Sequence, residues 1–467
     1  MLKSSQLLKR VWKPQKISVR NYPYPVQFSY FLRNQPQVQA TTMPNGLRVV
    51  SQERETYNCC VGLYFDAGSR YESLFENGIA HFFEHIAFKS TRSRSKTILE
   101  DLMSCTGAHF RSFTTREVVG YYAECLTQDV PCIVDILSDC IFNNCLCGNE
   151  IENQKKIVYA EMLDHDNDTN ALLDDYLHAT AFQGTPLGRS VMGFSNNLYN
   201  FSPTTIHNYL TKYFDPTKTV FAVVGGVKHE QVVSLANGYL CKFEPCKFED
   251  LGGYRYTGSE VRFRDDSVPV STVALAVEGP CYCDVHDCLV LDVAAHMIGG
   301  WDRSQYGGLD HAVNVAKKAS YSDVCDSYNT FSLKYRDGGL WGVKFMAPSL
   351  KLEDMLYFIQ NEFMYLCTMA PVGEVERARR QLKTKILSQL ESNRGMCHDL
   401  GRSFLYRDVY LTLDELIDKI DRIMDSDVRE VCYQYLYDKC PVVAAVGPSE
   451  GLPEYNRIRS GMYWLRL

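Results

Sequence analysis

Two histidines and a glutamate stand close together within residues 78–88 of the sequence. His81 and His85 are four residues apart, so on a helix they lie one above the other and both imidazoles can reach one ion. Glu84 directly precedes the second histidine, which places its carboxylate beside that ion. The order H-x-x-E-H is an inverted form of the zinc-hydrolase motif. The sequence therefore predicts that His81 and His85 bind zinc and that Glu84 is the catalytic base that activates water.

The segment with this motif could instead be a purely structural helix. Its other side chains are largely apolar, which argues for burial: Phe82, Phe83, Ile86 and Phe88. Two histidines and a glutamate buried among them without an ion would carry an uncompensated cost of desolvation. This cost favours the metal site.

A zinc site of this type needs a third protein ligand and leaves its fourth position open for water. A polar segment with helical character, residues 150–164, supplies Glu161, with Gln154 two turns earlier on the same face. The other acids of this segment could equally form a solvated helix face: Glu150, Glu152 and Asp164. Spacing alone therefore leaves the third ligand open.

The N-terminal segment is strongly basic. The first fifty residues contain eight Lys or Arg and no Asp or Glu, and residues 1–20 lack the central apolar block of a secretory signal. This composition predicts a mitochondrial transit peptide over residues 1–20, with a disordered basic tail as the alternative. Its removal would take away six positive charges and change the formal net charge from -7 to -13.

The composition of the whole chain is that of a globular protein, with 45% apolar and 22% charged residues. No run of 18 apolar residues occurs, so a membrane span is not expected. An acidic mature surface disfavours nucleic acid as a partner, because phosphates attract Lys and Arg. It suits a cationic partner or substrate instead.

The 18 cysteines form no C-x-x-C pair, and only looser neighbours occur, such as Cys59–Cys60, Cys145–Leu146–Cys147 and Cys281–Tyr282–Cys283. No regular spacing indicates a disulfide framework or a structural zinc site. We expect most cysteines to be reduced thiols that pack as small apolar side chains.

Two segments of the chain, residues 213–225 and 435–447, resemble each other. In each, a tyrosine at the end of a helix is followed by a turn and a buried strand that ends at glycine. The two glycines, Gly225 and Gly447, lie 222 residues apart. This similarity predicts a tandem duplication.

The same offset predicts what became of the metal site in the second half. Applied to His81 and Glu161, it gives Arg303 and Lys383, which do not bind zinc, so we expect one site per chain. A polar, glycine-bearing stretch near residue 252 separates the halves. We predict an N-terminal zinc-binding peptidase domain over residues 40–250 and a homologous C-terminal domain without metal ligands over residues 255–467.

Each half mixes strand-like segments with helical ones, without the regular alternation of a doubly wound sheet. The predicted fold class is therefore α+β, with two homologous α/β sandwich halves. In the first half we expect a helix at residues 97–106 and strands at residues 48–52, 58–65, 118–126 and 219–225.

The H-x-x-E-H segment, the position of Glu161 and the stretch Asp175–Gly188 resemble the pitrilysin-type zinc peptidases, notably the beta subunits of the mitochondrial processing peptidase. The stretch Glu454–Arg466 is similar to the first core subunits of respiratory ubiquinol:cytochrome c reductase, which belong to the same family. Together these similarities cover nearly the whole chain.

This resemblance implies that Glu161 is the third ligand of one Zn²⁺ per chain. It implies a clam-like heterodimer with an alpha-type processing peptidase subunit, which carries a glycine-rich loop, or with core subunit 2. It implies that the substrates are basic presequence peptides, cleaved in the mitochondrial matrix or at the matrix side of the inner membrane.

Two positions depart from the pattern of this family. Gln154 stands where the family has a second Glu that supports the metal site, and loss of such a partner costs about 10- to 100-fold in metal affinity or activity. Arg111 and Ser112 stand where the family has Asn and Ala on the strand that receives the substrate, so Arg111 is expected to hinder the peptide. Three functions stay open: an active peptidase subunit, a structural core subunit of a membrane respiratory complex, or a chain with both roles.

Overall fold

The structure, a computed structural model, describes residues 34–241, 253–305 and 308–463. The predicted transit peptide, the linker around residue 252 and the last residues of the stretch Glu454–Arg466 lie outside these ranges. The fold described below belongs to one unit, Pro36–Leu467.

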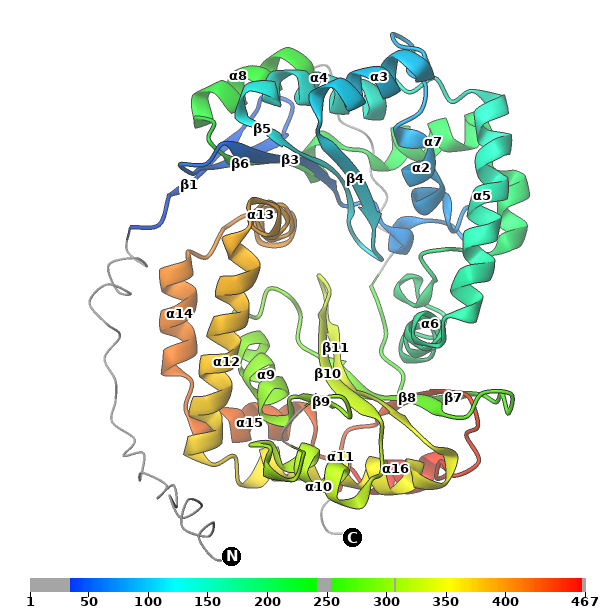
Figure 1. Ribbon diagram of the computed structural model, residues 1–467, viewed down its shortest axis with the longest axis vertical. Helices are drawn as coiled ribbons and strands as arrows, with labels where there is room; N and C mark the ends of the chain where they lie inside the picture. The colour runs from blue at the N-terminus through cyan, green and yellow to red at the C-terminus, as the bar shows by residue number, and fades with distance from the viewer. Residues whose placement is uncertain (1–33, 242–252, 306–307, 464–467) are drawn as a thin grey trace, which may run out of the picture. The chain divides into compact units, whose positions relative to one another are not determined.

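The first half is built on a six-stranded mixed sheet with the order β1-β2-β6-β3-β5-β4 (Figure 1). All four strands predicted from the sequence are confirmed. The bounds are β1 (Val38–Thr42), β2 (Arg48–Glu53), β3 (Asn58–Phe65), β4 (His109–Thr114), β5 (Val119–Leu126) and β6 (Thr219–Gly225).

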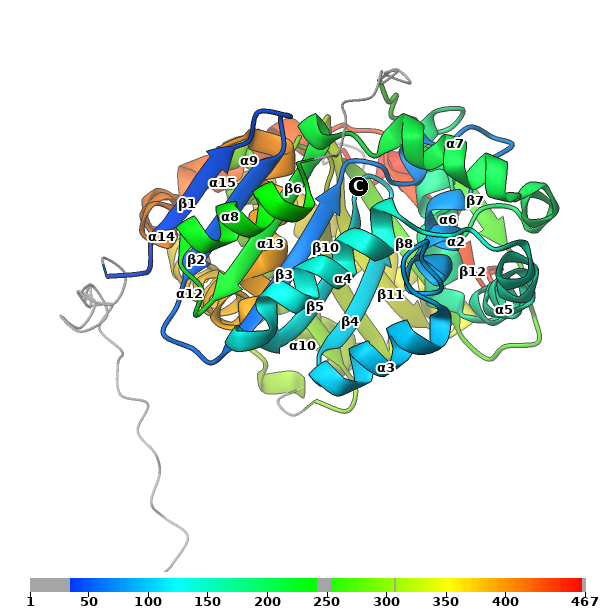
Figure 2. The same ribbon diagram turned by 90° about the horizontal axis from the view of Figure 1, so that it is seen from above.

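Helices α2, α4, α7 and α8 contribute apolar side chains to the core on one face of this sheet, and Figure 2 shows α8, α4 and α3 lying across it. The helix predicted at residues 97–106 is confirmed as α3. The helices of the first half are α2 (Ile79–Ala87), α3 (Lys96–Thr106), α4 (Val130–Phe142), α5 (Gly148–Asn167), α6 (Thr169–Ala181), α7 (Pro203–Tyr213) and α8 (His229–Tyr239).

The second half repeats this plan with the order β7-β12-β8-β11-β10-β9. Its strands are β7 (Glu260–Phe263), β8 (Ser271–Gly279), β9 (Gly300–Asp302), β10 (Ser327–Lys334), β11 (Gly339–Ala347) and β12 (Val442–Val446). Its helices are α9 (Val285–Ile298), α10 (Asn314–Ser322), α11 (Leu352–Thr368), α12 (Val372–Glu391), α13 (Asn393–Arg407), α14 (Leu413–Arg422), α15 (Asp425–Tyr435) and α16 (Tyr455–Ser460). The predicted α+β fold with two homologous halves is thus confirmed.

The repeated segments occupy equivalent places in the two sheets. Both β6 and β12 are interior strands; β6 ends at Gly225 and β12 is followed directly by Gly447, and both glycines have positive φ, +145° and +111°. Such angles favour glycine, which has no Cβ to clash with the backbone. The constant offset nevertheless fails for His81: Arg303 lies beyond β9, whereas the helix that corresponds to α2 is α9. The connections before α2 and α9 differ in length, 66–78 against 280–284, so the offset does not locate the residue equivalent to His81; one metal site per chain stays a prediction.

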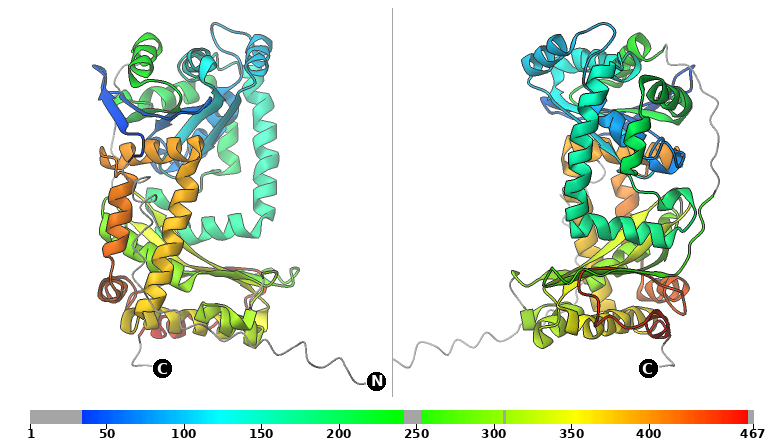
Figure 3. Two further views of the ribbon diagram at one scale, coloured as in Figure 1. Left: turned by 60° about the vertical axis from the view of Figure 1, so that its left-hand side comes forward. Right: turned by 90° about the vertical axis from the view of Figure 1, so that its right-hand side faces the viewer.

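One helix of each half packs against the sheet of the other half. Apolar residues of α13, including Met396 and Leu400, cover the face of the first sheet that carries Tyr64 and Tyr122. In the same way Leu173 and other residues of α6 cover one face of the second sheet. Figure 3 shows α5 leading into α6 and α12 leading into α13. The predicted domains, residues 40–250 and 255–467, stay a prediction, since this exchange joins the two halves.

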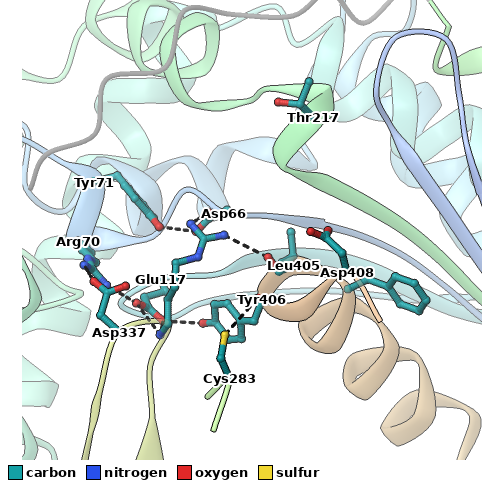
Figure 4. Close-up of polar contacts among 12 residues, drawn as sticks. Asp66, Arg70, Tyr71, Glu117, Thr217, Cys283, Asp337, Leu405, Tyr406 and Asp408 are labelled. Carbon is teal, nitrogen blue, oxygen red and sulfur yellow. Dashed lines mark hydrogen bonds and ion pairs between the residues drawn. The ribbon is translucent and has the colours of Figure 1, made fainter. Parts of the chain in front are cut away.

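A buried polar network joins the turn after β4 to the equivalent turn after β10 (Figure 4). The carboxylate of Glu117, 1% exposed, accepts hydrogen bonds from Arg70 (2.6 Å), Tyr406 (2.7 Å) and the backbone N–H of Arg336 (3.1 Å). Arg70 also pairs with Asp337. Removing one partner of the buried Arg70–Glu117 pair leaves an uncompensated charge. The network therefore fixes one half against the other.

No helix among the described residues is both long and apolar enough to span a bilayer.

Candidate functional site

Helix α2, which carries the H-x-x-E-H motif, is held at its N-terminus by the carboxylate of Glu72. This carboxylate accepts hydrogen bonds from the backbone N–H groups of Gly78 and Ala80 and from the side chain of Asn77, each at 2.8 Å. Burial raises the pKa of Glu72 to about 7 even though these bonds oppose the shift. An anion at this end satisfies N–H groups that have no partner within the helix. No motif in the sequence indicates this role of Glu72.

The C-terminus of α2 is held by a second residue that no sequence motif indicates. The side-chain amide of Asn144 donates to the carbonyl groups of Ile86 and Ala87, both at 3.2 Å. Between its two ends α2 buries Phe82 and Phe83 in the core. One face of α2 is therefore structural, and this burial directs the histidines to the other face, where the metal site stays a prediction.

The structure brings His81, His85 and Glu161 together, although α5 carries Glu161 far from the motif in sequence. Oε2 of Glu161 lies 2.9 Å from Nε2 of His85 and 3.4 Å from Nε2 of His81. One ligand atom from each of the three residues lies within 4.8 Å of the others. Among the described residues, this is the only such group of three His, Cys, Asp or Glu.

This arrangement fits a zinc ion. Ligand atoms held about 2.1 Å from a tetrahedral ion lie about 3.4 Å apart, close to the separations found here. Nε2 of His81 is buried without a hydrogen-bond partner, a cost that coordination to a metal would remove. His81, His85 and Glu161 could therefore hold the ion.

The electrostatics of the three side chains depend on one another. Burial alone would lower the pKa of His81, but the carboxylates of Glu161 and Glu84 outweigh it and raise the pKa to about 9. The contact with His81, 3.4 Å from Oε2 of Glu161, lowers the pKa of Glu161 below its usual value. Burial, followed by the charge of His81, lowers the pKa of His85. Without a metal, the site thus holds a protonated His81 beside an ionised Glu161.

Glu84 does not belong to the ligand group and is oriented by β4. The hydroxyl of Thr114 donates to Oε2 of Glu84 at 2.7 Å, and the same oxygen lies 3.8 Å from Nδ1 of His81. Burial would raise the pKa of Glu84, but the contact with His81 and the hydrogen bonds from Thr114 and Ser112 outweigh it and lower the pKa. Glu84 is therefore ionised and able to accept a proton beside the candidate metal position.

The remaining predicted residues lie around this group. Gln154 is 9% exposed on α5, two turns before Glu161. Ser112 lies on the face of β4 that also carries Thr114, next to Glu84. Arg111 lies on the opposite face of β4, directly across from Tyr122 in the register. The pleat of the strand thus separates Arg111 from the face that carries Glu84.

Two family models match the chain in tandem. Residues 48–195, which contain the whole candidate site, match the model described as insulinase (peptidase family M16). Residues 200–382 match the model described as the inactive domain of peptidase M16. This order agrees with a candidate site in the first half.

Two kinds of curated relative match almost the whole chain at equal identity. The mouse cytochrome b-c1 complex subunit 1, mitochondrial, is 39% identical over 94% of this chain and 92% of its own length. The human mitochondrial-processing peptidase subunit beta is 39% identical over 93% of this chain and 89% of its own length. The fold is similar to a chain of the solved structure of complex III2 from Candida albicans with Inz-5 bound, with a TM-score of 0.82 and 24% identity over 91% of this chain and all of that one. Together these similarities show that the chain belongs to the insulinase family of peptidases, peptidase family M16.

Proposed function

We propose that the chain is the zinc-bearing subunit of a metalloendopeptidase that removes basic presequences from imported mitochondrial proteins. Its relatives at 39% identity include both processing peptidase beta subunits and cytochrome b-c1 subunits, so identity alone does not decide between them. The observation that carries the proposal is the complete site: His81, His85 and Glu161 converge while Glu84 is held beside them as an ionised base.

Each residue of the proposed site has a separate role in catalysis. Zn²⁺, held by His81, His85 and Glu161, would polarise the scissile carbonyl and activate a water molecule. Glu84 accepts the proton of this water and passes it to the leaving amine. Thr114 keeps the carboxylate of Glu84 oriented during both transfers through its hydrogen bond.

The substrate backbone would bind along the open edge of β4. This strand pairs only with β5 in the first sheet, so its other edge is free of strands among the described residues. The hydrogen bond from the N–H of Thr115 to the carbonyl of Val118, in the turn between β4 and β5, determines which residues of β4 pair with β5 through their backbone groups. It directs the backbone groups of Phe110, Ser112 and Thr114 toward the open edge, where an extended peptide can add as a further strand.

Arg111 would affect the choice of substrate more than access to the site. Its own backbone groups pair with β5, and its side chain faces away from Glu84. A peptide added to the edge of β4 would present every second side chain to that face. Arg111 would disfavour a basic side chain there, because two cations repel each other.

Charge supports a basic substrate elsewhere along the site. The chain carries a formal net charge of -7. Asp164, one turn beyond Glu161 on α5, is exposed. Acidic side chains around a site raise the local concentration of a cationic ligand.

The second candidate function is that of core subunit 1 in a respiratory complex, with weak or no peptidase activity. Gln154 supports it, because an amide cannot supply the negative charge of the Glu that the family resemblance implies. The 39% identity to the mouse cytochrome b-c1 complex subunit 1 supports it as well. The partner would be an alpha-type processing peptidase subunit under the first proposal and core subunit 2 under the second.

The names of the relatives also support a mitochondrial location. We infer that residues 1–20 direct the chain to the matrix, where it acts free or on the matrix side of the inner membrane. A reporter behind residues 1–50 should then enter mitochondria.

Cleavage by the assembled complex separates the two functions. The chain is combined with an alpha-type processing peptidase subunit and given a basic presequence peptide, as wild type, Glu84→Gln and the control Glu152→Gln, whose carboxylate is exposed and pairs with Lys155. We expect wild type and control to cleave equally and Glu84→Gln to be slower by a factor on the order of 100 or more. Wild-type chain that assembles and cuts no presequence would favour the core subunit.

A further inference from the structure

Two exposed thiols meet at the start of helix α5. Cys145 and Cys147 are both exposed, and their sulfur atoms lie 3.6 Å apart. Leu146 between them has a left-handed φ of +49°, which is rare for a residue with a Cβ. Its backbone N–H is held by the side chain of Asn144 at 2.9 Å. The local fold therefore brings the two sulfurs together.

This thiol pair belongs to a strap, residues 143–147, that connects α4 to α5 and closes over the end of α2. Asn144 caps the last carbonyl groups of α2, and the N–H of Cys145 donates to the carbonyl of Ser90 at 3.0 Å. Cys147 is the N-cap residue of α5. The strap thus joins the helix of His81 and His85 to the helix of Glu161.

The geometry points to a modification site: Cys145 and Cys147 form a reversible disulfide when the chain meets hydrogen peroxide. The thiolate sulfur of Cys147 attacks one peroxide oxygen, the O–O bond breaks, and water leaves once the released oxygen is protonated, giving a sulfenic acid. The sulfur of Cys145 then attacks this oxidised sulfur. The S–S bond forms, the S–O bond breaks, and the hydroxide leaves as water with the proton of Cys145. The two sulfurs lose two electrons in total, and the peroxide gains them.

The order of attack follows from the positions of the two sulfurs. Cys147 stands at the N-terminus of α5, where the helix dipole favours negative charge. The hydrogen bond between the two thiols raises the pKa of Cys145. Cys145 therefore keeps its proton until the second step. The ring closed by two cysteines with one residue between them is small and strained, so thiol reductants reopen it readily.

A second C-x-C segment shows that spacing alone does not create this site. In Cys281–Tyr282–Cys283 the thiol of Cys283 points to the carbonyl of Tyr406 at 3.7 Å (Figure 4). The carbonyl of Cys281 accepts the thiol of Cys288 at 3.2 Å. The sulfur of Cys283 is thus directed away from its neighbour, which makes this segment an internal control.

Peptide mapping of the full chain after treatment with hydrogen peroxide tests the proposal. Free thiols are alkylated at intervals, and the peptides with Cys145–Cys147, Cys281–Cys283 and the exposed Cys105 are compared. We expect Cys145 and Cys147 to become unreactive together, at least about tenfold faster than the other thiols, and to recover after reduction. Equal rates for both C-x-C segments, or loss of one thiol without the other, would overturn the disulfide.

Serine variants and hydrogen exchange complete the test. Cys145→Ser and Cys147→Ser change exposed side chains, so both variants should fold, and neither should form a disulfide in this peptide. The S–S bond is about 2.05 Å long, so the sulfurs must approach by roughly 1.5 Å and shift the strap. We expect amide exchange at the end of α2 to change on oxidation of the wild type and not of the serine variants. Disulfide formation without that change would refute the coupling to α2.

Discussion

The hydroxyl of Thr114 donates a 2.7 Å hydrogen bond to Oε2 of Glu84 and so links the last residue of β4 to the H-x-x-E-H helix. Thr114 is also the last residue of the strand edge along which we propose that the substrate backbone binds. A single side chain thus positions the proposed base relative to the proposed peptide.

Replacement of Thr114 by valine should impair catalysis without emptying the metal site. The loss of a hydrogen bond to a charged group costs about 1.5 kcal/mol, which corresponds to a decrease in kcat of about tenfold. The control is Thr211→Val, which removes an exposed hydroxyl that bonds only within α7. Zinc content should stay at the wild-type level in both variants. A loss of zinc together with activity would show that Thr114 acts on the ligands instead.

Replacement of Gln154 by glutamate should strengthen the site. Gln154 is buried on the face of α5 that leads to Glu161. A carboxylate there would restore the negative charge near the metal and raise zinc affinity or cleavage by about 10- to 100-fold. Zinc titration and presequence cleavage measure both effects. An unchanged zinc affinity would contradict a role for this position in supporting the metal.

Replacement of Glu72 by glutamine should loosen helix α2. The carboxylate accepts three hydrogen bonds, and an amide presents a donor to at least one of these N–H groups. We expect a loss of about 2 kcal/mol in the free energy of unfolding in urea, with weaker zinc binding. The control is Glu76→Gln in the same loop, where the carboxylate accepts the hydroxyl of Ser73. Equal stability of the two variants would contradict the anchoring role.

Zinc binding should release a proton from His81. Its pKa of about 9 in the metal-free chain means that the ring is protonated at pH 7, whereas coordination requires the neutral ring. The zinc affinity should therefore rise with pH, by about tenfold per unit from pH 7 to 9, and level off above 9. Calorimetry in buffers of different ionisation enthalpy counts the proton. An affinity independent of pH between 7 and 9 would show that His81 is already neutral in the metal-free chain and would contradict the raised pKa.

Local sequence pattern predicted the regular elements well. The strands at residues 58–65 and 219–225 match their predicted bounds, because both are short apolar runs bounded by turns. The pattern did not identify β4, since His109–Thr114 mixes polar and apolar side chains at an open sheet edge. Helix α5 was predicted from the sequence pattern. The assignment of Glu161, and not a neighbouring acid, as the third metal ligand required the family resemblance.

Long-range contacts could not be predicted from the sequence. Glu72 and Asn144 hold the two ends of α2, but nothing in their neighbours distinguishes them from loop residues. The packing of α6 and α13 on the sheet of the other half could not be predicted either, because an apolar helix face does not specify which sheet it covers. The offset that led to Arg303 failed since loop lengths diverge more readily than strands.

Metal analysis of the mature chain tests the central claim most directly. The chain is purified without chelator as wild type, His81→Ala and Glu84→Gln, and its zinc is quantified. Because Glu84 is no ligand in this account, we expect one zinc per chain in wild type and Glu84→Gln, and a loss of zinc in His81→Ala. A wild-type chain without zinc, or undiminished zinc in His81→Ala, would contradict the assignment of the site.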